Sequence, residues 1–474
     1  MSCLVTEQEL STRRPKRLSS APRDLSRRSH RKGICWGFIN GKTCWWQYAF
    51  RTPAPGTIVW FVAGTVAFLA CTAPMSANES LAIPHVEIAV DGNPSTALPT
   101  SDGRFVFVSV TNVGGPNYST PDVEAGKRRG VVSGVDILRR VNDSLQFVRF
   151  VPIGGRGANG MVFLRGEKTI AIAAGDEGVV FLDVQAAIVG NARPYTASQG
   201  PGAGTWDVVA SPDGKYLFAA NEYGQFQLQR GNIGVVAIKT DSEGNFASGR
   251  MIRQIPAGNK VPRLTLSEDG RRLYVVREIR PHAAVVQSAG RRNPLLTKND
   301  CIQIKGTSPH PNGLLTVIDV QRAITMPSGE GSIVAEIASG CSPVAVIESK
   351  NRATLYVSAR GDNRILRFSP VLLDSDPEHA FLGAIDSGGD APVGLRLLRD
   401  EKTLVVTNSN RFGERRGNIS IINLRDPSAP YPIRHVPAGE FPRNITVAQD
   451  GRLIFVTNYT SRTLEVLTVG GGDP

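Results

Sequence analysis

The chain of 474 residues contains 49 Gly and 31 Pro, and 41% of its residues are hydrophobic and 20% charged. This composition indicates a turn-rich globular protein with a sizeable core; it excludes collagen, a coiled coil, a disulfide-dense miniprotein and a membrane protein with many spans. Most of the net charge of +12 lies in residues 1–56, which hold eleven Lys and Arg against three acidic residues. Because nucleic-acid-binding proteins concentrate basic residues on the folded domain, we expect no nucleic-acid partner.

Residues 1–56 are predicted to be a disordered basic leader, and residues 57–77 the core of a signal peptide or a membrane anchor. No residue from Thr57 to Ala73 is charged. Basic residues precede this run and small residues follow it, which is the order of a secretory signal. Its length lies between a long signal-peptide core and a minimal membrane span.

Several export routes remain open for this leader. They are cleavage near Ala73 or Ala77, acylation at Cys71, twin-arginine export through Arg13-Arg14, and an uncleaved membrane tether through residues 57–73. Each route places the rest of the chain outside the cytoplasm, in the periplasm, in the medium or anchored to the membrane and facing outward.

From about residue 83 to residue 470 a module of short strands recurs seven times. The last copy, Val436–Val469, has a strand ending in Ala-Gly, a loop with Pro, a strand, an Asp-Gly turn, a strand ending in Asn, and another strand. Three more copies keep the Asp-Gly turn, and three weaker copies lack it. The strand runs are short, β-branched and bounded by Gly, Asp, Asn or Ser, and an Asp-Gly turn between two such runs is typical of a hairpin.

Each module supplies three strands, named a to c in chain order, and a fourth strand d that leads into the next module. Four-stranded sheets repeated radially are β-propeller blades, so the predicted fold is an all-β, seven-bladed β-propeller over residues 83–470. Residues 85–92 come before the first module, and we expect them to complete the last blade and thereby remove the open sheet edges. The other d strands are expected at 147–153, 193–198, 251–256, 333–338, 381–386 and 432–437.

The strand ends FVTN at 455–458, VVTN at 405–408, SVTN at 109–112 and FAAN at 218–221 resemble the YVTN β-propeller repeat family. That family is similar to the lactonase-like seven-bladed propellers, which include the 6-phosphogluconolactonase type. The resemblance implies the propeller fold and raises the possibility of lactone hydrolysis.

Strand direction alternates within a blade, so the d-to-a and b-to-c loops share one face of the propeller. The long insertions are all b-to-c, at 113–132, 222–232, 278–312 and 409–417, which predicts one loop-rich face that carries the binding residues. Cys301 and Cys341 fall in loops of this face in neighbouring blades. In an oxidising compartment we expect them to form a disulfide, with two unpaired thiols as the alternative.

Candidate site residues lie at the loop-rich end of the central channel. Arg263 and Arg443 directly follow loop prolines, and the densest polar cluster contains Arg277, Glu278 and His282, with His310 farther along the same insertion. Arginines of this kind bind an anionic or polyhydroxylated ligand through charge-assisted hydrogen bonds, with amides from the strand-b ends Asn221, Asn408 and Asn458. Alternatively, the asparagines satisfy loop backbone and the arginines are merely solvated.

The sequence lacks the short motifs of several chemistries. It contains no C-x-x-C-H, C-x-x-C, H-E-x-x-H, G-x-S-x-G or G-x-x-x-x-G-K-[ST] pattern, and the histidines are scattered. We therefore expect no metal and no cofactor.

The leading hypothesis is an exported, monomeric scaffold that binds a protein or a small polar or anionic ligand on its loop-rich face. The alternative, which the resemblance implies, is a lactonase-like hydrolase in which Glu278 or His282 acts as general base and Arg277 or Arg263 stabilises the oxyanion. A weaker alternative is a propeller that serves a haem or quinone enzyme as redox partner.

Overall fold

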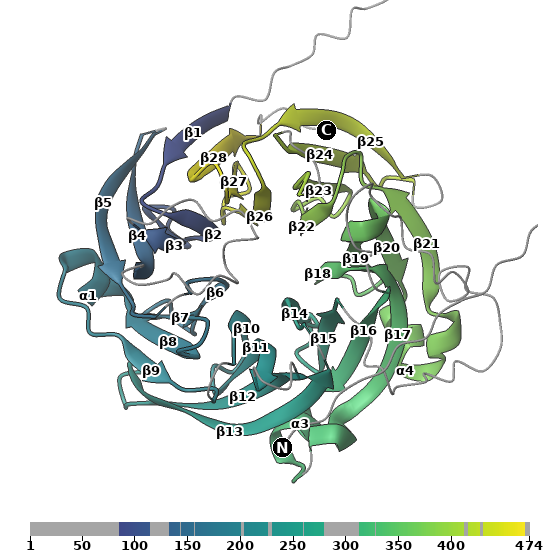
Figure 1. Ribbon diagram of the computed structural model, residues 1–474, viewed down its shortest axis with the longest axis horizontal. Coiled ribbons are helices and arrows are strands. Elements are labelled where there is room, and N and C mark those ends of the chain that lie inside the picture. The colour runs from purple at the N-terminus through teal and green to yellow at the C-terminus, as the bar shows by residue number, and fades with distance from the viewer. Residues whose placement is uncertain are drawn as a thin grey trace, which may run out of the picture. The chain divides into compact units, whose positions relative to one another are not determined.

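The structure, a computed structural model, describes residues 85–113, 132–142, 144–155, 157–200, 203–225, 230–258, 260–278, 312–327, 329–411, 416–426 and 430–469. They form seven four-stranded antiparallel sheets arranged radially, with the first strand of each module nearest the axis (Figure 1). The predicted seven-bladed β-propeller is confirmed.

The strands of blades 1 to 3 follow one another in chain order. Blade 1 contains β2 (Asn93–Pro99), β3 (Phe105–Val113), β4 (Val132–Val141) and β5 (Ser144–Pro152). Blade 2 contains β6 (Met161–Phe163), β7 (Thr169–Ala173), β8 (Val179–Asp183) and β9 (Tyr195–Ala197). Blade 3 contains β10 (Thr205–Ala210), β11 (Tyr216–Gln225), β12 (Arg230–Thr240) and β13 (Phe246–Gly258).

Blades 4 to 6 repeat the same order. Blade 4 contains β14 (Arg263–Leu266), β15 (Arg272–Arg277), β16 (Asn312–Asp319) and β17 (Ile333–Cys341). Blade 5 contains β18 (Pro343–Glu348), β19 (Leu355–Ala359), β20 (Arg364–Phe368) and β21 (Phe381–Asp386). Blade 6 contains β22 (Pro392–Leu397), β23 (Thr403–Asn408), β24 (Asn418–Asn423) and β25 (Tyr431–Pro437).

Blade 7 joins the two ends of the propeller domain. Its first three strands are β26 (Pro442–Val447), β27 (Leu453–Asn458) and β28 (Thr463–Thr468), and its fourth is β1 (His85–Ala89). β1 runs antiparallel to β28, with His85 opposite Leu467 and Ala89 opposite Thr463. The predicted closure of the last blade by the N-terminal strand is confirmed.

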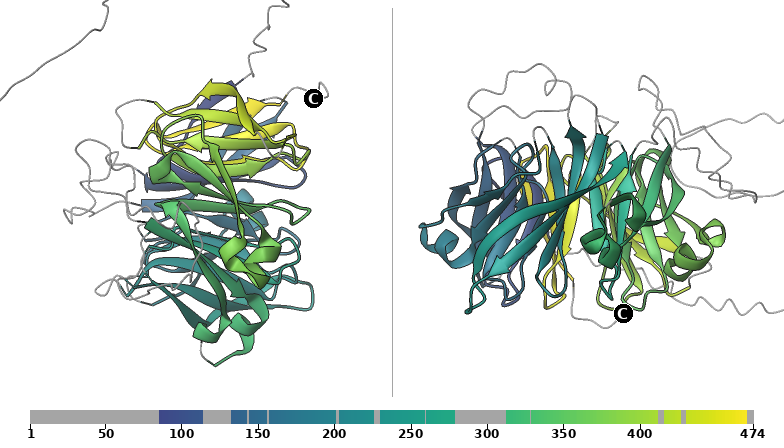
Figure 2. Two further views of the ribbon diagram at one scale, coloured as in Figure 1. Left: turned by 90° about the vertical axis from the view of Figure 1, so that its right-hand side faces the viewer. Right: turned by 90° about the horizontal axis from the view of Figure 1, so that it is seen from below.

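The hydrophobic core consists of seven clusters, and each lies between two neighbouring blades. Their fully buried aromatic side chains include Phe107, Phe181, Phe218, Phe368 and Phe455. Alternating residues of each strand face the two adjacent sheets, so every blade is apolar on both faces. The strands run from one face of the disc to the other, as the side views show (Figure 2).

The a-to-b turns have the same backbone geometry in all seven blades. A residue in the left-handed region occupies the equivalent position each time: Gly103, Glu167, Gly214, Gly270, Arg352, Glu401 and Gly451. In blade 3, for example, the Ser211 hydroxyl donates to Asp213 Oδ1 at 2.6 Å and the Lys215 N–H donates to the same oxygen at 3.0 Å. The three copies without Asp-Gly therefore keep the turn.

Three short helices occupy c-to-d connections at the outer rim (Figure 1). They are α1 (Val184–Val189), α3 (Val320–Thr325) and α4 (Pro370–Ser375), each with a capping Asp or Ser at its N-terminus. The 3-10 turns are η2 (Gly329–Ser332), η3 (Arg360–Asp362) and η4 (Pro377–His379). We call the side with the a-to-b turns and c-to-d connections the turn face. The sequence patterns did not indicate these helices.

Residues 1–56, the predicted basic leader, and residues 57–77, the predicted signal core or anchor, lie outside the described residues. Within the part of the chain that the structure describes, no helix is long and apolar enough to cross a membrane.

Candidate functional site

Charged and aromatic side chains gather around the axis at the loop-rich face. They come from two positions of the module, the start of strand a and the end of strand b with the residues just after it. Both positions reach the same face because neighbouring strands are antiparallel. We call this set the axial cluster: Trp206, Glu222, Arg263, Glu278, Arg360, Arg411, Arg443 and Tyr459.

Arg443, the second residue of β26, reaches from blade 7 to other blades. Its guanidinium carbon lies 4.6 Å from the ring centre of Trp206 in blade 3 and 4.9 Å from that of Tyr459. Nη1 donates to Ser95 Oγ in blade 1 at 2.9 Å. Burial and the charges of Arg263 and Arg411 lower the pKa of Arg443, and the guanidinium stays charged between the two rings.

Arg263, the first residue of β14, makes a second contact across the axis. Nε lies 3.6 Å from Asp207 Oδ2, and Nη1 donates to Asn444 Oδ1 of blade 7 at 3.4 Å. Burial raises the pKa of Asp207, and the Arg263 charge opposes that rise. We call Trp206, Asp207, Arg263, Arg443 and Asn444 the cross-axis layer, because they join blades 3, 4 and 7 through the middle of the ring.

Two carboxylates stand on the solvent side of this layer: Glu222 lies near the end of β11, and Glu278 directly follows β15. Arg360 Nη2 donates to Glu278 Oε1 at 3.1 Å. The Lys260 N–H donates to the Glu222 carbonyl at 3.1 Å, and the Glu278 N–H donates to the Lys260 carbonyl at 3.0 Å. Burial and the Glu278 charge raise the pKa of Glu222 to about 6, while Lys260 and Arg411 oppose the rise.

Arg411 brings a second arginine to these carboxylates from the b-to-c loop of blade 6. Its side chain is solvent-exposed, and its guanidinium carbon lies 5.7 Å from the Phe441 ring centre. Desolvation by the surrounding protein and the Arg360 charge lower the pKa of Arg411, while Glu278 and Glu222 raise it. The mouth therefore brings an exposed arginine and a carboxyl group of raised pKa into electrostatic interaction.

The predicted site residues divide between this cluster and the interior of the blades. Arg263, Arg443 and Glu278 belong to the axial cluster. Arg277 does not: its guanidinium donates to the Ala257 carbonyl at 2.6 Å and to Glu336 on β17, and the residue is only 3% exposed. Arg277 thus joins the last strand of blade 3 to the last strand of its own blade, away from the axial cluster.

The three strand-b asparagines are fully buried and bridge strands of their own blades. Asn221 Nδ2 donates to Asn232 Oδ1 at 2.8 Å, and Thr205 Oγ1 donates to Asn221 Oδ1 at 2.7 Å. Asn408 Nδ2 donates to Ser420 Oγ at 2.8 Å. Asn458 Nδ2 donates to Glu465 Oε2 at 3.1 Å. These contacts explain structurally why the repeat has Asn at the end of strand b. Ligand binding by these residues stays a prediction.

His282, His310 and Cys301 lie outside the described residues. Cys341, at the end of β17, is 3% exposed, and its N–H donates to Asp362 Oδ2 at 2.7 Å. Its pairing with Cys301 remains a prediction. Among the described residues no group of three His, Cys, Asp or Glu is placed to hold a metal ion.

Sequence reasoning missed Trp206, Glu222, Arg360, Arg411 and Tyr459. A signal for three of them was present in the repeat itself. Glu222, Tyr459 and Arg360 follow the module position that holds Asn in four of the seven copies, as Glu278 does, and aligning the seven modules at that position would have gathered them.

Comparison with known proteins concerns architecture. No protein-family model matches the sequence, and no curated protein does. Among solved structures, a chain of the mitotic checkpoint complex is 13% identical with a TM-score of 0.54, covering 86% of this chain and 99% of its own. Kuenenia stuttgartiensis hydrazine synthase is 13% identical with a TM-score of 0.52, covering 81% and 98%.

The periplasmic gluconolactonase of Pseudomonas aeruginosa is also similar, at 17% identity and a TM-score of 0.51, covering 74% of this chain and 88% of its own. The likeness is one of fold. At these sequence identities the similarity supports the seven-bladed propeller fold and carries no information about the chemistry of the axial cluster.

Proposed function

We propose that this protein is an exported β-propeller of the YVTN type that binds a small polar anion at its loop-rich face. Export is supported by the uncharged run after a basic leader, and the repeat assignment by seven modules, four of which end strand b in Asn. The observation that carries the binding proposal is the convergence of Arg360, Arg411 and Glu222 above the cross-axis layer.

The chemistry of the cluster favours a polyhydroxylated acid, such as a sugar acid. The exposed Arg411 offers a forked donor for a carboxylate, and Glu222 accepts hydrogen bonds from hydroxyl groups. Phe441 and Tyr459, whose ring centres lie 5.6 Å apart, supply an apolar wall beside Arg411. The cross-axis layer forms the floor beneath this site.

Calorimetric titration of the purified exported part with gluconate and glucuronate tests the proposal. Arg411→Ala should weaken binding about tenfold or more, because a charge-assisted pair is lost. Arg364→Ala is the matched control, since Arg364 is an exposed arginine at the start of β20. Absence of saturable binding, or equal weakening by both variants, would contradict the proposal.

A second candidate, hydrolysis of a sugar lactone, is favoured by one observation: the pKa of Glu222 lies at about 6 beside Arg411. A carboxylate with this pKa is suited to act as general base toward water, and an adjacent guanidinium to stabilise the oxyanion. In this scheme Glu222 takes the role that the sequence suggested for Glu278 or His282. The periplasmic gluconolactonase of similar fold gives weak support.

A panel of sugar lactones distinguishes binding from turnover. The hydrolase candidate predicts a rate that rises with pH through about 6 and falls about a hundredfold or more in Glu222→Gln. A rate that Glu222→Gln leaves unchanged, or no turnover on any lactone, would remove this candidate and leave the binding proposal standing.

We also propose the Cys301–Cys341 disulfide as a clip between the blade 4 insertion and blade 5. Burial of Cys341 at the blade boundary supports it. Non-reducing peptide mapping should recover the two cysteines in one linked peptide, and two alkylated free thiols would refute the pairing.

A further inference from the structure

A pocket opens on the turn face, at the end of the a strands opposite to the axial cluster. Its volume is about 240 Å³, and the a-to-b turns of blades 4 to 7 line it. Its charged lining residues are Glu268, Glu348, Lys350, Arg396, Arg399 and Glu401. Arg396 lies near the end of β22, whereas Arg443 lies near the start of β26. At the rise of a strand, these two levels are separated by about 10 Å.

The cross-axis layer stands between this pocket and the outer residues of the axial cluster, Glu222, Arg360 and Arg411. Arg443 and Trp206 meet within that layer, as do Arg263 and Asn444. The turn-face pocket is therefore a separate compartment, and a ligand bound there contacts different residues from a ligand at the loop-rich mouth.

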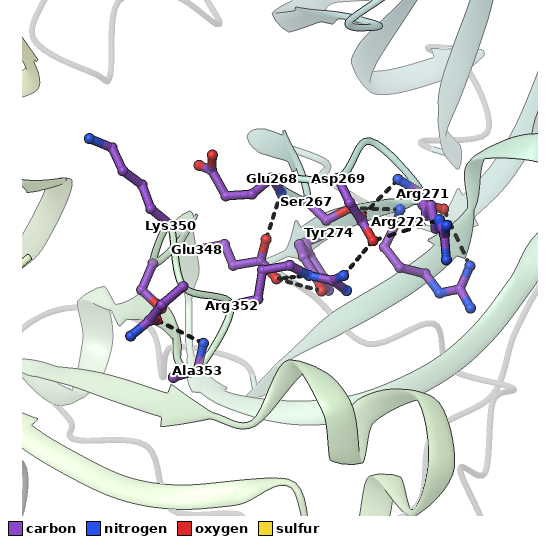
Figure 3. A network of polar contacts seen from close by, with 12 residues as sticks. Ser267, Glu268, Asp269, Arg271, Arg272, Tyr274, Glu348, Lys350, Arg352 and Ala353 are labelled. Atoms are coloured by element: carbon purple, nitrogen blue, oxygen red, sulfur yellow. Dashed lines mark hydrogen bonds and ion pairs between the residues drawn. The ribbon is translucent and has the colours of Figure 1, made fainter.

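The carboxylate of Glu348 connects the turns of blades 4 and 5. It accepts hydrogen bonds from Tyr274 Oη at 3.1 Å and from the Glu268 N–H at 2.7 Å, and Arg352 Nε lies 3.7 Å away. Arg352 also pairs with Asp269 (Figure 3). The carboxylate of Glu348 is thus held within the wall, and its side chain is only 1% exposed.

The cationic side chains of the pocket form fewer direct contacts than the Glu348 carboxylate. Within the ranges that the structure describes, the side chains of Lys350, Arg396 and Arg399 make no hydrogen bond or ion pair. Glu401 accepts the Lys350 N–H at 2.8 Å. Glu268 and Lys350 both extend away from the wall network to the same side in Figure 3. Arg396 interacts electrostatically with Glu268 and Glu401. Three cationic groups therefore share the pocket with these two carboxylates, of which one already accepts a hydrogen bond.

We propose that the turn-face pocket binds a small multivalent oxyanion, with Arg396 as its principal donor and Lys350 and Arg399 as supporting charges. A guanidinium matches carboxylate and phosphate oxygens through two parallel hydrogen bonds, and the ammonium of lysine adds a point charge. Glu268 and Glu401 are the competing negative charges, which the ligand must tolerate.

Titration with citrate and pyrophosphate, as separate probes, tests the site and distinguishes carboxylate from phosphate ligands. Wild-type protein should bind at least one probe saturably at low ionic strength. Arg396→Ala should weaken that binding about tenfold or more, and Lys350→Ala should weaken it less. Glu268→Gln should tighten it, because the competing carboxylate is lost.

Arg425→Ala, an exposed arginine of the same blade outside the pocket, is the control and should leave binding unchanged. Arg411→Ala separates this proposal from the proposed function, since it should affect only the loop-rich mouth. Failure of both probes to bind, loss of binding in Arg411→Ala but not in Arg396→Ala, or weaker binding in Glu268→Gln would overturn the turn-face site.

Discussion

At the scale of single residues, the chemistry of this protein depends on which polar side chains reach the axis. Three arginines from two module positions illustrate the point. Arg263 and Arg443 begin strands a and cross the axis, whereas Arg277 ends strand b and turns outward to Glu336. Their residue type does not distinguish these environments; their place in the blade does.

The buried carboxyl group of Asp136 makes the stability of the fold depend on pH. It lies on β4 with no solvent exposure, and its Oδ2 accepts the Asp91 N–H at 2.9 Å. Burial raises the pKa of Asp136 to about 7. Between pH of about 4 and 7 the folded state therefore holds a proton that the unfolded state has lost, so this group lowers stability as pH rises through that window.

Asp136→Asn should remove this contribution. Relative to wild type, the variant should gain a few kcal/mol in the free energy of unfolding between pH 5 and pH 8. Urea unfolding at both pH values measures the change, and the other carboxyl groups cancel in the comparison. A difference between variant and wild type that is the same at both pH values would contradict the assignment.

How far the sequence predicts the site also depends on single residues. The arginines after loop prolines could be predicted because Pro and the repeat place them at the start of strand a. Trp206 and Arg411 could not, because their importance comes from distant partners: Trp206 meets an arginine four blades along the chain. Such contacts depend on ring closure and leave no local pattern.

At the scale of elements, the a-to-b turns both end the hairpins and connect blades. Where Gly is missing from the left-handed position, the side chain there binds the turn of the preceding blade. Glu167 Oε2 accepts the Ser101 N–H at 3.0 Å and the Ser101 hydroxyl at 2.9 Å. Glu401 accepts the Lys350 N–H, and Arg352 pairs with Asp269. At these positions a hydrogen bond or ion pair to the preceding blade offsets the cost of holding a residue other than glycine in the left-handed region.

This balance between interblade contacts and backbone strain predicts that, at position 167, a glycine variant is more stable than an alanine variant. Glu167→Ala loses both hydrogen bonds and keeps the left-handed backbone, so it should destabilise by about 1 kcal/mol. Glu167→Gly loses the same bonds but relieves the backbone, so it should be more stable than the alanine variant by about 0.5–1 kcal/mol. Urea midpoints measure both. An alanine variant as stable as the glycine variant would show that the turn carries no strain.

Turn chemistry also explains the limits of element prediction. The Asp-Gly copies indicated their hairpins directly, whereas blades 2, 5 and 6 had to be inferred from strand spacing. The short helices α1, α3 and α4 were missed, because six residues are too few to display helical periodicity against a background of strands.

At the scale of the whole molecule, the fold is a ring closed by β1. Repeat counting predicted seven blades because each module buries its apolar faces only against two neighbours, so an incomplete ring would leave exposed surfaces. The closure also explains why residues before the first module pair with the last one.

Removal of the closing strand should be costly. A chain that starts at Asn93 should melt on the order of 10 °C below one that starts at Ile83, because β28 loses its partner and Asp136 its backbone donor. Both chains lack the leader, which makes them a matched pair for calorimetry. Equal melting temperatures would mean that β1 contributes little to the ring.

The ring also separates the two proposed compartments, and the loop-rich one carries the proposed function. The most direct test is a crystal structure of the exported part soaked with gluconate. We predict density for the ligand against Arg411, Arg360 and Glu222, above the Arg443 guanidinium. An empty loop-rich mouth at saturating ligand, or density confined to the turn face, would contradict the account.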